Sequence, residues 1–206
     1  MKLYRSGGPN PRVVEIFLAQ KGVSLETITI DIGSGENRRQ PYLAKNSLGE
    51  TPALELDGGE AISQVTAICE YLEERYPEPV LIGETPEERA RTRMWVRRID
   101  LNIVHPMVSA FRSGEGLEFF KSRVRCIPQA AADLKALADD GLGWLNRHGS
   151  FRPYVCGERL GLADIFLFCF LDFGRQYGQP LNPKHGNLAR WFDGIRDRLA
   201  ARAVDE

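Results

Sequence analysis

No long hydrophobic run occurs in this sequence of 206 residues, because its longest wholly apolar segment is the seven residues from Ile165 to Leu171. A helix that crosses a bilayer needs about 20 such residues, so we expect no membrane partner. The N-terminal residues MKLYRSGG carry no apolar stretch after the lysine, and we expect no signal peptide. The 27 basic and 28 acidic residues nearly cancel, which excludes the charge surplus that is typical of nucleic-acid binding.

Cysteine and histidine are also scarce, with four and three residues respectively. The sequence has no CxxC pair and no histidine spacing that predicts a zinc site, so we expect no metal. Without an export signal, free thiols in a reducing cytoplasm are the favoured state of the cysteines. Apolar residues make up 43% of the chain and charged residues 27%, which is typical of a globular protein that buries a core.

The first part of the chain alternates strand and helix patterns. Apolar and polar residues alternate from Leu25 to Ile32 at the strand period, and Asp57-Gly58-Gly59 predicts a hairpin turn between two further strands. We expect Ser63 to cap the helix that follows the hairpin. The pattern therefore predicts a small α/β unit of the order βαβ-ββα. Its expected strands are 2–5, 25–32, 51–56 and 60–62, and its expected helices are 9–22, 41–45 and one from 63 onward.

The rest of the chain follows a helical pattern after Tyr76-Pro77-Glu78-Pro79 interrupts the first part. We expect residues 78–86 to link two domains, and Pro86 followed by two glutamates is typical of a helix start. The predicted fold class is α/β plus all-α, with a mixed-sheet domain followed by a helical bundle. The expected helices are 87–113, 117–147 with a kink at Pro128, 162–174 and 187–201.

The helix expected at 162–174 carries two structural signals. Gly161 stands where a cap residue belongs, and Asp164 three positions later can reach back to the N–H of that cap. The run from Ile165 to Leu171 is apolar on all sides, so we expect it at the buried centre of the helical domain.

A proline at the start of a strand, as in Thr51-Pro52, needs a reason because it removes a hydrogen-bond donor from the sheet. An edge strand is one explanation. A cis peptide that presents the backbone of the preceding residue to a peptide-like ligand is another. In the order βαβ-ββα, a proline that opens the third strand is typical of thioredoxin-like folds.

Four stretches that span both halves of the chain resemble cytosolic glutathione S-transferases, and most of all the bacterial and fungal branches in which PNP or PNG begins the first helix. They are SGGPNPRVVEIFLAQKG, KNSLGETPALELDGG, ISQVTAICEYLEERYP and YVCGERLGLADIFLF. The resemblance implies a thioredoxin-like domain at residues 1–77 that binds glutathione, an all-helical domain at 87–206 and a cytoplasmic homodimer. It also implies that the glutathione thiolate attacks a small apolar electrophile or a peroxide. Two alternatives stay open: a binding module without catalysis, and a glutathione-dependent isomerase or dehalogenase.

The same resemblance implies which residues contact glutathione. Thr51, beside Pro52, would pair with the backbone of the cysteinyl residue. Gln64 matches a residue that holds the γ-glutamyl group, whereas Val65 stands where a hydroxyl is expected, so that its backbone N–H and the hydroxyl of Thr66 are the remaining donors. Lys45 lies near the loop that meets the glycyl carboxylate, although a solvated surface lysine is an equal alternative.

The group that stabilises the thiolate is less clearly marked. A thiol has a pKa of about 8.5, and only its thiolate is nucleophilic, so the site needs a donor near the sulfur. Ser6, at the end of the first strand, and Asn10, in the PNP stretch, are the two candidates. Gly8 occupies the position of a catalytic hydroxyl in related branches and lacks one. His105 and Ser109, four residues apart on a helix, form a third possibility in which they hold a water molecule.

The resemblance also places the electrophile against the first long helix. The expected lining residues are Met107, Val108, Phe111 and Arg112. At each of these positions, packing in the core of the helical domain is the alternative.

Overall fold

The computed structural model describes residues 1–202, and the chain divides into two compact units, Met1–Ile82 and a second unit that begins at Gly83. The boundary falls inside the segment 78–86 that the sequence marks as a linker. Each unit has its own core and is described separately.

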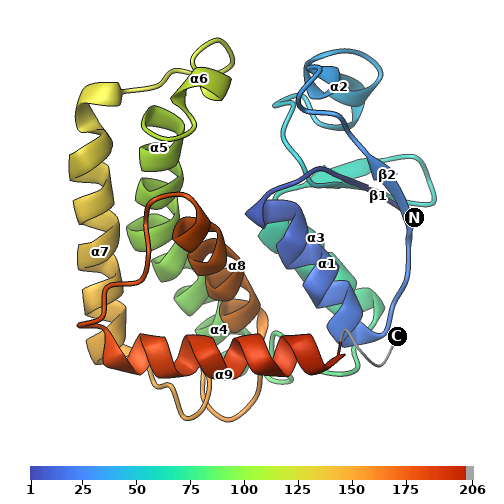
Figure 1. Ribbon diagram of the computed structural model, residues 1–206. Coiled ribbons are helices and arrows are strands. Elements are labelled where there is room, and N and C mark those ends of the chain that lie inside the picture. Colours follow the sequence, from blue (N-terminus) through green and yellow to red (C-terminus); the bar gives the residue numbers. More distant parts are fainter. Residues whose placement is uncertain (203–206) are drawn as a thin grey trace. The chain divides into compact units, whose positions relative to one another are not determined.

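The first unit is built on a four-stranded mixed sheet with the strand order β2-β1-β3-β4. Strand β1 pairs in parallel with β2 and antiparallel with β3, which forms a hairpin with β4. Helices α1 and α3 cover one face of the sheet, and α2 lies on the other (Figure 1). This arrangement confirms the predicted thioredoxin-like fold. Its elements are β1 (Lys2–Arg5), α1 (Pro9–Lys21), β2 (Glu26–Thr29), the 3₁₀ turn η1 (Glu36–Arg38), α2 (Tyr42–Lys45), β3 (Ala53–Glu55), β4 (Ala61–Ser63) and α3 (Val65–Arg75).

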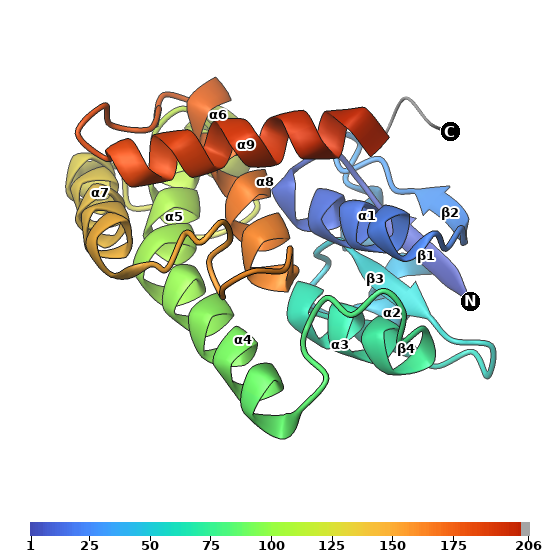
Figure 2. The ribbon, with the colours of Figure 1, turned by 90° about the horizontal axis from the view of Figure 1, so that it is seen from below.

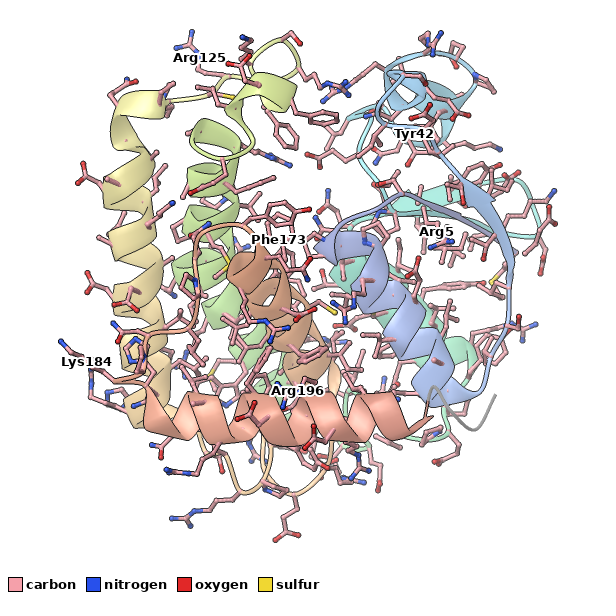
Figure 3. All side chains as sticks on the ribbon, in the orientation of Figure 1. Arg5, Tyr42, Arg125, Phe173, Lys184 and Arg196 are labelled. Carbon is pink, nitrogen blue, oxygen red and sulfur yellow. The ribbon has the colours of Figure 1, made fainter. Side chains whose placement is uncertain are left out.

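Both faces of this sheet are covered by apolar side chains. Towards α1 and α3, Leu3, Phe17 and Ile68 are almost completely buried. On the side of α2, Tyr42 packs with Ile30 and with other apolar residues of the sheet. Tyr42 therefore lies between α2 and the sheet (Figure 3).

A buried ion pair joins the ends of α1 and α3. Lys21 Nζ lies 2.5 Å from the carboxylate of Glu73, and their side chains are 0% and 3% exposed. The same ammonium donates to the carbonyl of Pro79 at 2.6 Å, and Glu73 accepts the backbone N–H groups of Leu81 and Ile82. The last residues of the first unit are thus fixed to its two long helices by one charged pair.

All the named elements in the described part of the second unit are helical (Figure 2). Helix α5 packs along α7, and α8 contacts both α4 and α9. Among the described residues, no helix is both long and apolar enough to cross a membrane. The elements are α4 (Pro86–Ile99), the π-helical turn η2 (Asp100–Val104), α5 (His105–Ser113), α6 (Leu117–Phe120), the 3₁₀ turn η3 (Pro128–Ala130), α7 (Ala131–His148), α8 (Leu162–Gln176) and α9 (Gly186–Arg202).

The prediction of a single kinked helix at 117–147 is wrong. The chain forms the one-turn helix α6, leaves helical structure, and begins again with η3 at Pro128 before α7. Pro128 has no N–H to donate, so it starts the new helical segment instead of bending an existing one. The expected helix at 87–113 is continuous, but η2 widens it in the middle.

The wide turn η2 has a cause within the sequence. Pro106 cannot donate a hydrogen bond to the carbonyl four residues earlier, which belongs to Asn102. That carbonyl faces Gly141 of α7, where an added Cβ would stand only 2.2 Å from the Asn102 oxygen. Glycine at 141 therefore permits the close approach of α7 to the wide turn.

Asp164 has the structural role that the sequence predicts. Its Oδ2 accepts the N–H of Gly161, and its Oδ1 accepts the N–H of Val155 and the indole N–H of Trp191. Burial raises the pKa of this carboxyl to about 6, because the charged form is removed from water. The apolar run from Ile165 to Leu171 is buried at every position, also as expected.

Candidate functional site

Ser6 and Thr51 meet at one edge of the sheet of the first unit. Strands β1 and β3 pair as far as Tyr4 and Ala53, and the same register continued for two residues brings Ser6 opposite Thr51. Their hydroxyl oxygens are hydrogen-bonded at 2.5 Å, and either one can be the donor. Ser6 Oγ also donates to the carbonyl of Gly7 at 3.2 Å. The Thr51-Pro52 peptide is cis, which is one of the two readings that the sequence allows.

Gln64 lies at the same edge. In the register of β3 and β4, Ala53 faces Ser63, which places Gln64 level with Pro52. The φ angle of Gln64 is +74°, a conformation that residues other than glycine rarely adopt and that is enriched at binding sites. Gln64 occupies the cap position of α3, and no side chain there accepts the first N–H groups of the helix. These donors are therefore available to an anionic ligand.

The prediction that Ser63 caps α3 is wrong. Ser63 is paired with Ala53 in the hairpin and ends β4, so the helix begins two residues later at Val65. The Val65 side chain is buried in the core of the unit at 7% exposure, which explains an apolar residue at this position. Only its backbone can face a ligand, whereas Thr66 in the same turn is exposed.

The other end of the candidate site is the start of α1. Gly8 has a φ angle of +119°, which L side chains rarely adopt, so a residue that bears a hydroxyl would be strained there. Asn10 lies in the first helical turn and is half-buried, while Ser6 is only 6% exposed. Ser6 and Asn10 are the candidate donors to a sulfur atom that this unit supplies.

Lys45, expected to meet the glycyl carboxylate of glutathione, already contacts a carboxylate. Its Nζ lies 2.8 Å from Glu55 Oε1, and Tyr4 donates its hydroxyl proton to the other oxygen of Glu55. These donors lower the pKa of Glu55, and the hydrogen bond to Glu55 raises the pKa of Tyr4 to about 12. A ligand carboxylate would have to share Lys45 with Glu55.

In the second unit, α5 carries the residues expected to contact the electrophile. Met107 is 1% exposed and packs beside Gly174, so packing is its role in this unit. Val108, Ser109, Phe111 and Arg112 are half-buried, and His105 is exposed.

Phe111 belongs to an aromatic cluster that the sequence analysis missed. Its ring centroid lies 4.8 Å from that of Phe173, 5.0 Å from that of Tyr177 and 5.8 Å from that of Phe120. Phe173, labelled in Figure 3, lies in the last turn of α8, and Tyr177 caps that helix four residues later, with the two ring centroids 4.7 Å apart. The guanidinium of Arg112 covers the Phe120 ring at 5.5 Å. The spacing of four residues between Phe173 and Tyr177 was a signal in the sequence for an aromatic surface.

Within residues 1–202, no group of three or more His, Cys, Asp or Glu side chains could hold a metal ion. The candidate site of the first unit consists of hydroxyl, amide and backbone donors, which suit an anionic peptide more than a cation.

Comparison with known proteins identifies the family. The family models named Glutathione S-transferase, N-terminal domain and Glutathione S-transferase, C-terminal domain match residues 3–80 and 128–194. Glutathione S-transferase 2 of Saccharomyces cerevisiae is 30% identical over 206 aligned residues, which cover 97% of this chain and 86% of the yeast protein. The chain belongs to the glutathione S-transferase family.

Two further relatives show how broad this family is. A maleylacetoacetate isomerase of Pseudomonas aeruginosa is 33% identical to this glutathione S-transferase family member over 171 residues, which cover 82% of this chain and 78% of the isomerase. The crystal structure of a glutathione S-transferase domain-containing protein of Marinobacter aquaeolei superposes with a TM-score of 0.85 at 30% identity and covers 95% of this chain and 97% of its own. The family and fold expected from the sequence are thereby confirmed.

Proposed function

We propose that this chain is a glutathione transferase whose first unit binds glutathione at the sheet edge formed by Ser6, Thr51 and Gln64. The observation that carries the proposal is the convergence of three kinds of group at that edge. They are the backbone that precedes β3, a hydroxyl pair and the N-terminus of α3. Glutathione offers a peptide backbone, a thiol and an α-carboxylate to match them. Relatives named glutathione S-transferase support the same activity.

Each part of the site receives one part of the ligand in this proposal. The backbone of Thr51 pairs with the cysteinyl residue. Gln64 and the free N–H groups of Val65 and Thr66 take the γ-glutamyl end, where the positive end of the helix dipole favours a carboxylate. Lys45 takes the glycyl carboxylate and exchanges part of its contact with Glu55 for it.

The chemistry requires a thiolate. The thiol of glutathione loses its proton to solvent, the sulfur attacks the electrophilic carbon, and a halide or similar group leaves with the bonding electron pair. To lower the thiol pKa by two units, the site must favour the thiolate by about 2.7 kcal/mol. When Thr51 donates to Ser6 Oγ, the hydroxyl proton of Ser6 can turn from the Gly7 carbonyl to the sulfur, and the amide of Asn10 is the second donor.

The decisive measurement is the ultraviolet absorbance of the bound thiolate as a function of pH. We expect a pKa one to about three units below that of the free thiol. Replacing the responsible donor, by Ser6→Ala or Asn10→Ala, should lower turnover at least about tenfold and raise that pKa. Ser24→Ala, an exposed serine of the same unit, is the control. If neither variant differs from the control, neither residue is the donor. Binding without a lowered pKa would instead support a non-catalytic binding module.

A glutathione-dependent isomerase is a second candidate, because the Pseudomonas aeruginosa isomerase is 33% identical to this chain. A glutathione-dependent isomerase uses the same thiolate but releases glutathione unchanged at the end of the reaction. Thiol titration during turnover separates the two functions, since a transferase consumes one thiol per product and an isomerase consumes none.

For the electrophile, we propose the aromatic cluster of the second unit as the apolar contact surface, with Phe111 at its centre. Replacing Phe111 by Ala should raise the KM for an aryl halide more than the KM for glutathione. We further propose that the protein is a cytoplasmic homodimer that needs no metal. Light scattering of the full chain tests the dimer, and turnover in the presence of a chelator tests the metal.

A further inference from the structure

Two side chains outside the proposed glutathione contacts hold the backbone that leads into Thr51. Tyr42 Oη donates to the carbonyl of Glu50 at 2.6 Å, and Asn46 Nδ2 donates to the same oxygen at 2.7 Å. A carbonyl oxygen has two lone pairs, so these two donors use its full accepting capacity. The orientation of the peptide group between Glu50 and Thr51 is therefore set by α2 and the residue that ends it.

Both donors are themselves fixed. Tyr42 is 3% exposed and packs against Ile30 in the small core between α2 and the sheet. Asn46 is 6% exposed, and its Oδ1 accepts the N–H of Leu48 at 3.1 Å. Because neither side chain can rotate without breaking these contacts, the Glu50 carbonyl has a rigid support.

The carbonyl of Gly49, the residue before Glu50, also accepts a hydrogen bond from a buried side chain. Asn37 Nδ2 donates to the carbonyl of Gly49 at 2.6 Å. Gly49 has a φ angle of +62°, and a Cβ added there would stand 2.6 Å from the carbonyl oxygen of Asn37. Two successive carbonyls before Thr51 thus accept buried side-chain donors, and the loop has little freedom to turn its peptide groups.

A planar peptide transmits this constraint to Thr51, because fixing the Glu50 carbonyl also fixes the direction of the Thr51 N–H. The hydroxyl of Thr51 in turn contacts Ser6 Oγ at 2.5 Å. We propose that Tyr42 and Asn46 are positioning residues that act through the Glu50 carbonyl to orient the backbone and the hydroxyl of Thr51 for glutathione. This inference rests on the proposed function, because it assigns Thr51 to the glutathione site.

Conservative variants can remove each donor separately. Tyr42→Phe keeps the buried ring and removes the hydroxyl, and Asn46→Asp removes the amide donor while it keeps an acceptor for Leu48. The full-length chain is titrated with glutathione by calorimetry at a temperature where every variant is folded, and the absorbance of the bound thiolate is followed with pH. Tyr71→Phe is the control, since the described residues offer the hydroxyl of this half-buried α3 tyrosine no hydrogen-bond partner.

We expect the Kd of glutathione to rise about fivefold in Tyr42→Phe and in Asn46→Asp, and further in the double variant, with no change in Tyr71→Phe. The pKa of the bound thiol should rise in the double variant, because Thr51 no longer holds Ser6 in place. A purely structural role would lower only the unfolding midpoint, and unchanged Kd and thiol pKa in the folded variants would overturn the inference.

The outcomes also separate this inference from the proposed function. If the wild-type chain binds no glutathione, both are overturned. If it binds glutathione and the variants bind equally well, only the positioning role is overturned. If one single variant does not fold, the other decides by the same two readouts.

Discussion

The buried pair of Lys21 and Glu73 allows a quantitative prediction about the first unit. Glu73→Gln removes the carboxylate from Lys21, whose ammonium is 0% exposed and then keeps two carbonyls and the face of the Phe17 ring as its neighbours. Loss of one partner from a buried ion pair costs about 3–5 kcal/mol. The glutamine keeps one acceptor oxygen for the N–H groups of Leu81 and Ile82, so we expect a total loss of about 4 kcal/mol. Domains of this size are stable by about 5–15 kcal/mol, so the effect is large.

A matched pair on the surface provides the control. Lys121 Nζ and Glu118 are also 2.5 Å apart, but their side chains are 55% and 84% exposed. Solvent screening reduces the interaction of such a pair to about 0.5 kcal/mol or less. Equal distances with unequal burial isolate the contribution of desolvation.

The assay is a double-mutant cycle with Lys21→Met, Glu73→Gln and both together, compared with the corresponding cycle at Lys121 and Glu118. The three tryptophans, Trp95, Trp144 and Trp191, all lie in the second unit, so hydrogen exchange of the α1 and α3 amides is the better measure of the first. We expect the Lys21–Glu73 coupling to exceed about 2 kcal/mol. A loss below about 0.5 kcal/mol in Glu73→Gln, or additive single variants, would refute the reasoning.

Two further predictions concern the second unit. Gly141→Ala places a Cβ 2.2 Å from the Asn102 carbonyl and should cost at least about 2 kcal/mol, whereas Gly194→Ala, which meets nothing within 4 Å in α9, should gain up to about 1 kcal/mol. Tryptophan fluorescence in urea measures both, and equal effects would contradict the close approach of α7. Asp164 has a folded pKa of about 6 against 3.8 for a solvent-exposed aspartate, so its burial costs stability as the pH rises between these values. The stability of the wild type relative to Asp164→Asn should therefore fall by up to about 3 kcal/mol from pH 4 to pH 7, and a difference independent of pH would disprove the assignment.

Local patterns were sufficient to predict much of the fold. The turn Asp57-Gly58-Gly59 predicts the hairpin of β3 and β4 because its residue types suit only a tight turn, and Asp164 predicts the start of α8 from its distance to Gly161. Both signals act over a few residues. The segment after Leu117 was predicted wrongly because apolar spacing and Pro128 are equally compatible with a kinked helix and with a fresh start.

The side chains that support the candidate site, in contrast, could not be predicted from local sequence patterns. Tyr42 lies outside the stretches that carry the family resemblance, and Asn46 lies inside one without a role that its residue type predicts. Their role depends on a carbonyl that reaches them only when the loop from Asn46 to Thr51 has folded back. The two bonds span only eight and four residues, but they form only in the particular loop conformation that turns the Glu50 carbonyl towards α2, and residue types alone do not specify that conformation. The contact of Ser6 with Thr51 is partly predictable, since it follows from the strand register once the order of the strands in the sheet is known.

The two missing hydroxyls of the site bear directly on whether this family member is an enzyme. Read from the sequence, Gly8 and Val65 favour a binding module that has lost its catalytic groups. In the structure, each has a local cause, because position 8 has a φ angle that glycine accommodates best and the side chain at position 65 is part of the core. Both departures therefore have a local structural cause, and the test of catalysis is made on Ser6 and Asn10. Thr51 can donate to Ser6 Oγ, and Ser6 can turn its own proton from the Gly7 carbonyl to a sulfur atom. The loss of thiol activation in Ser6→Ala is therefore the result that separates an enzyme built on Ser6 from one built on Asn10.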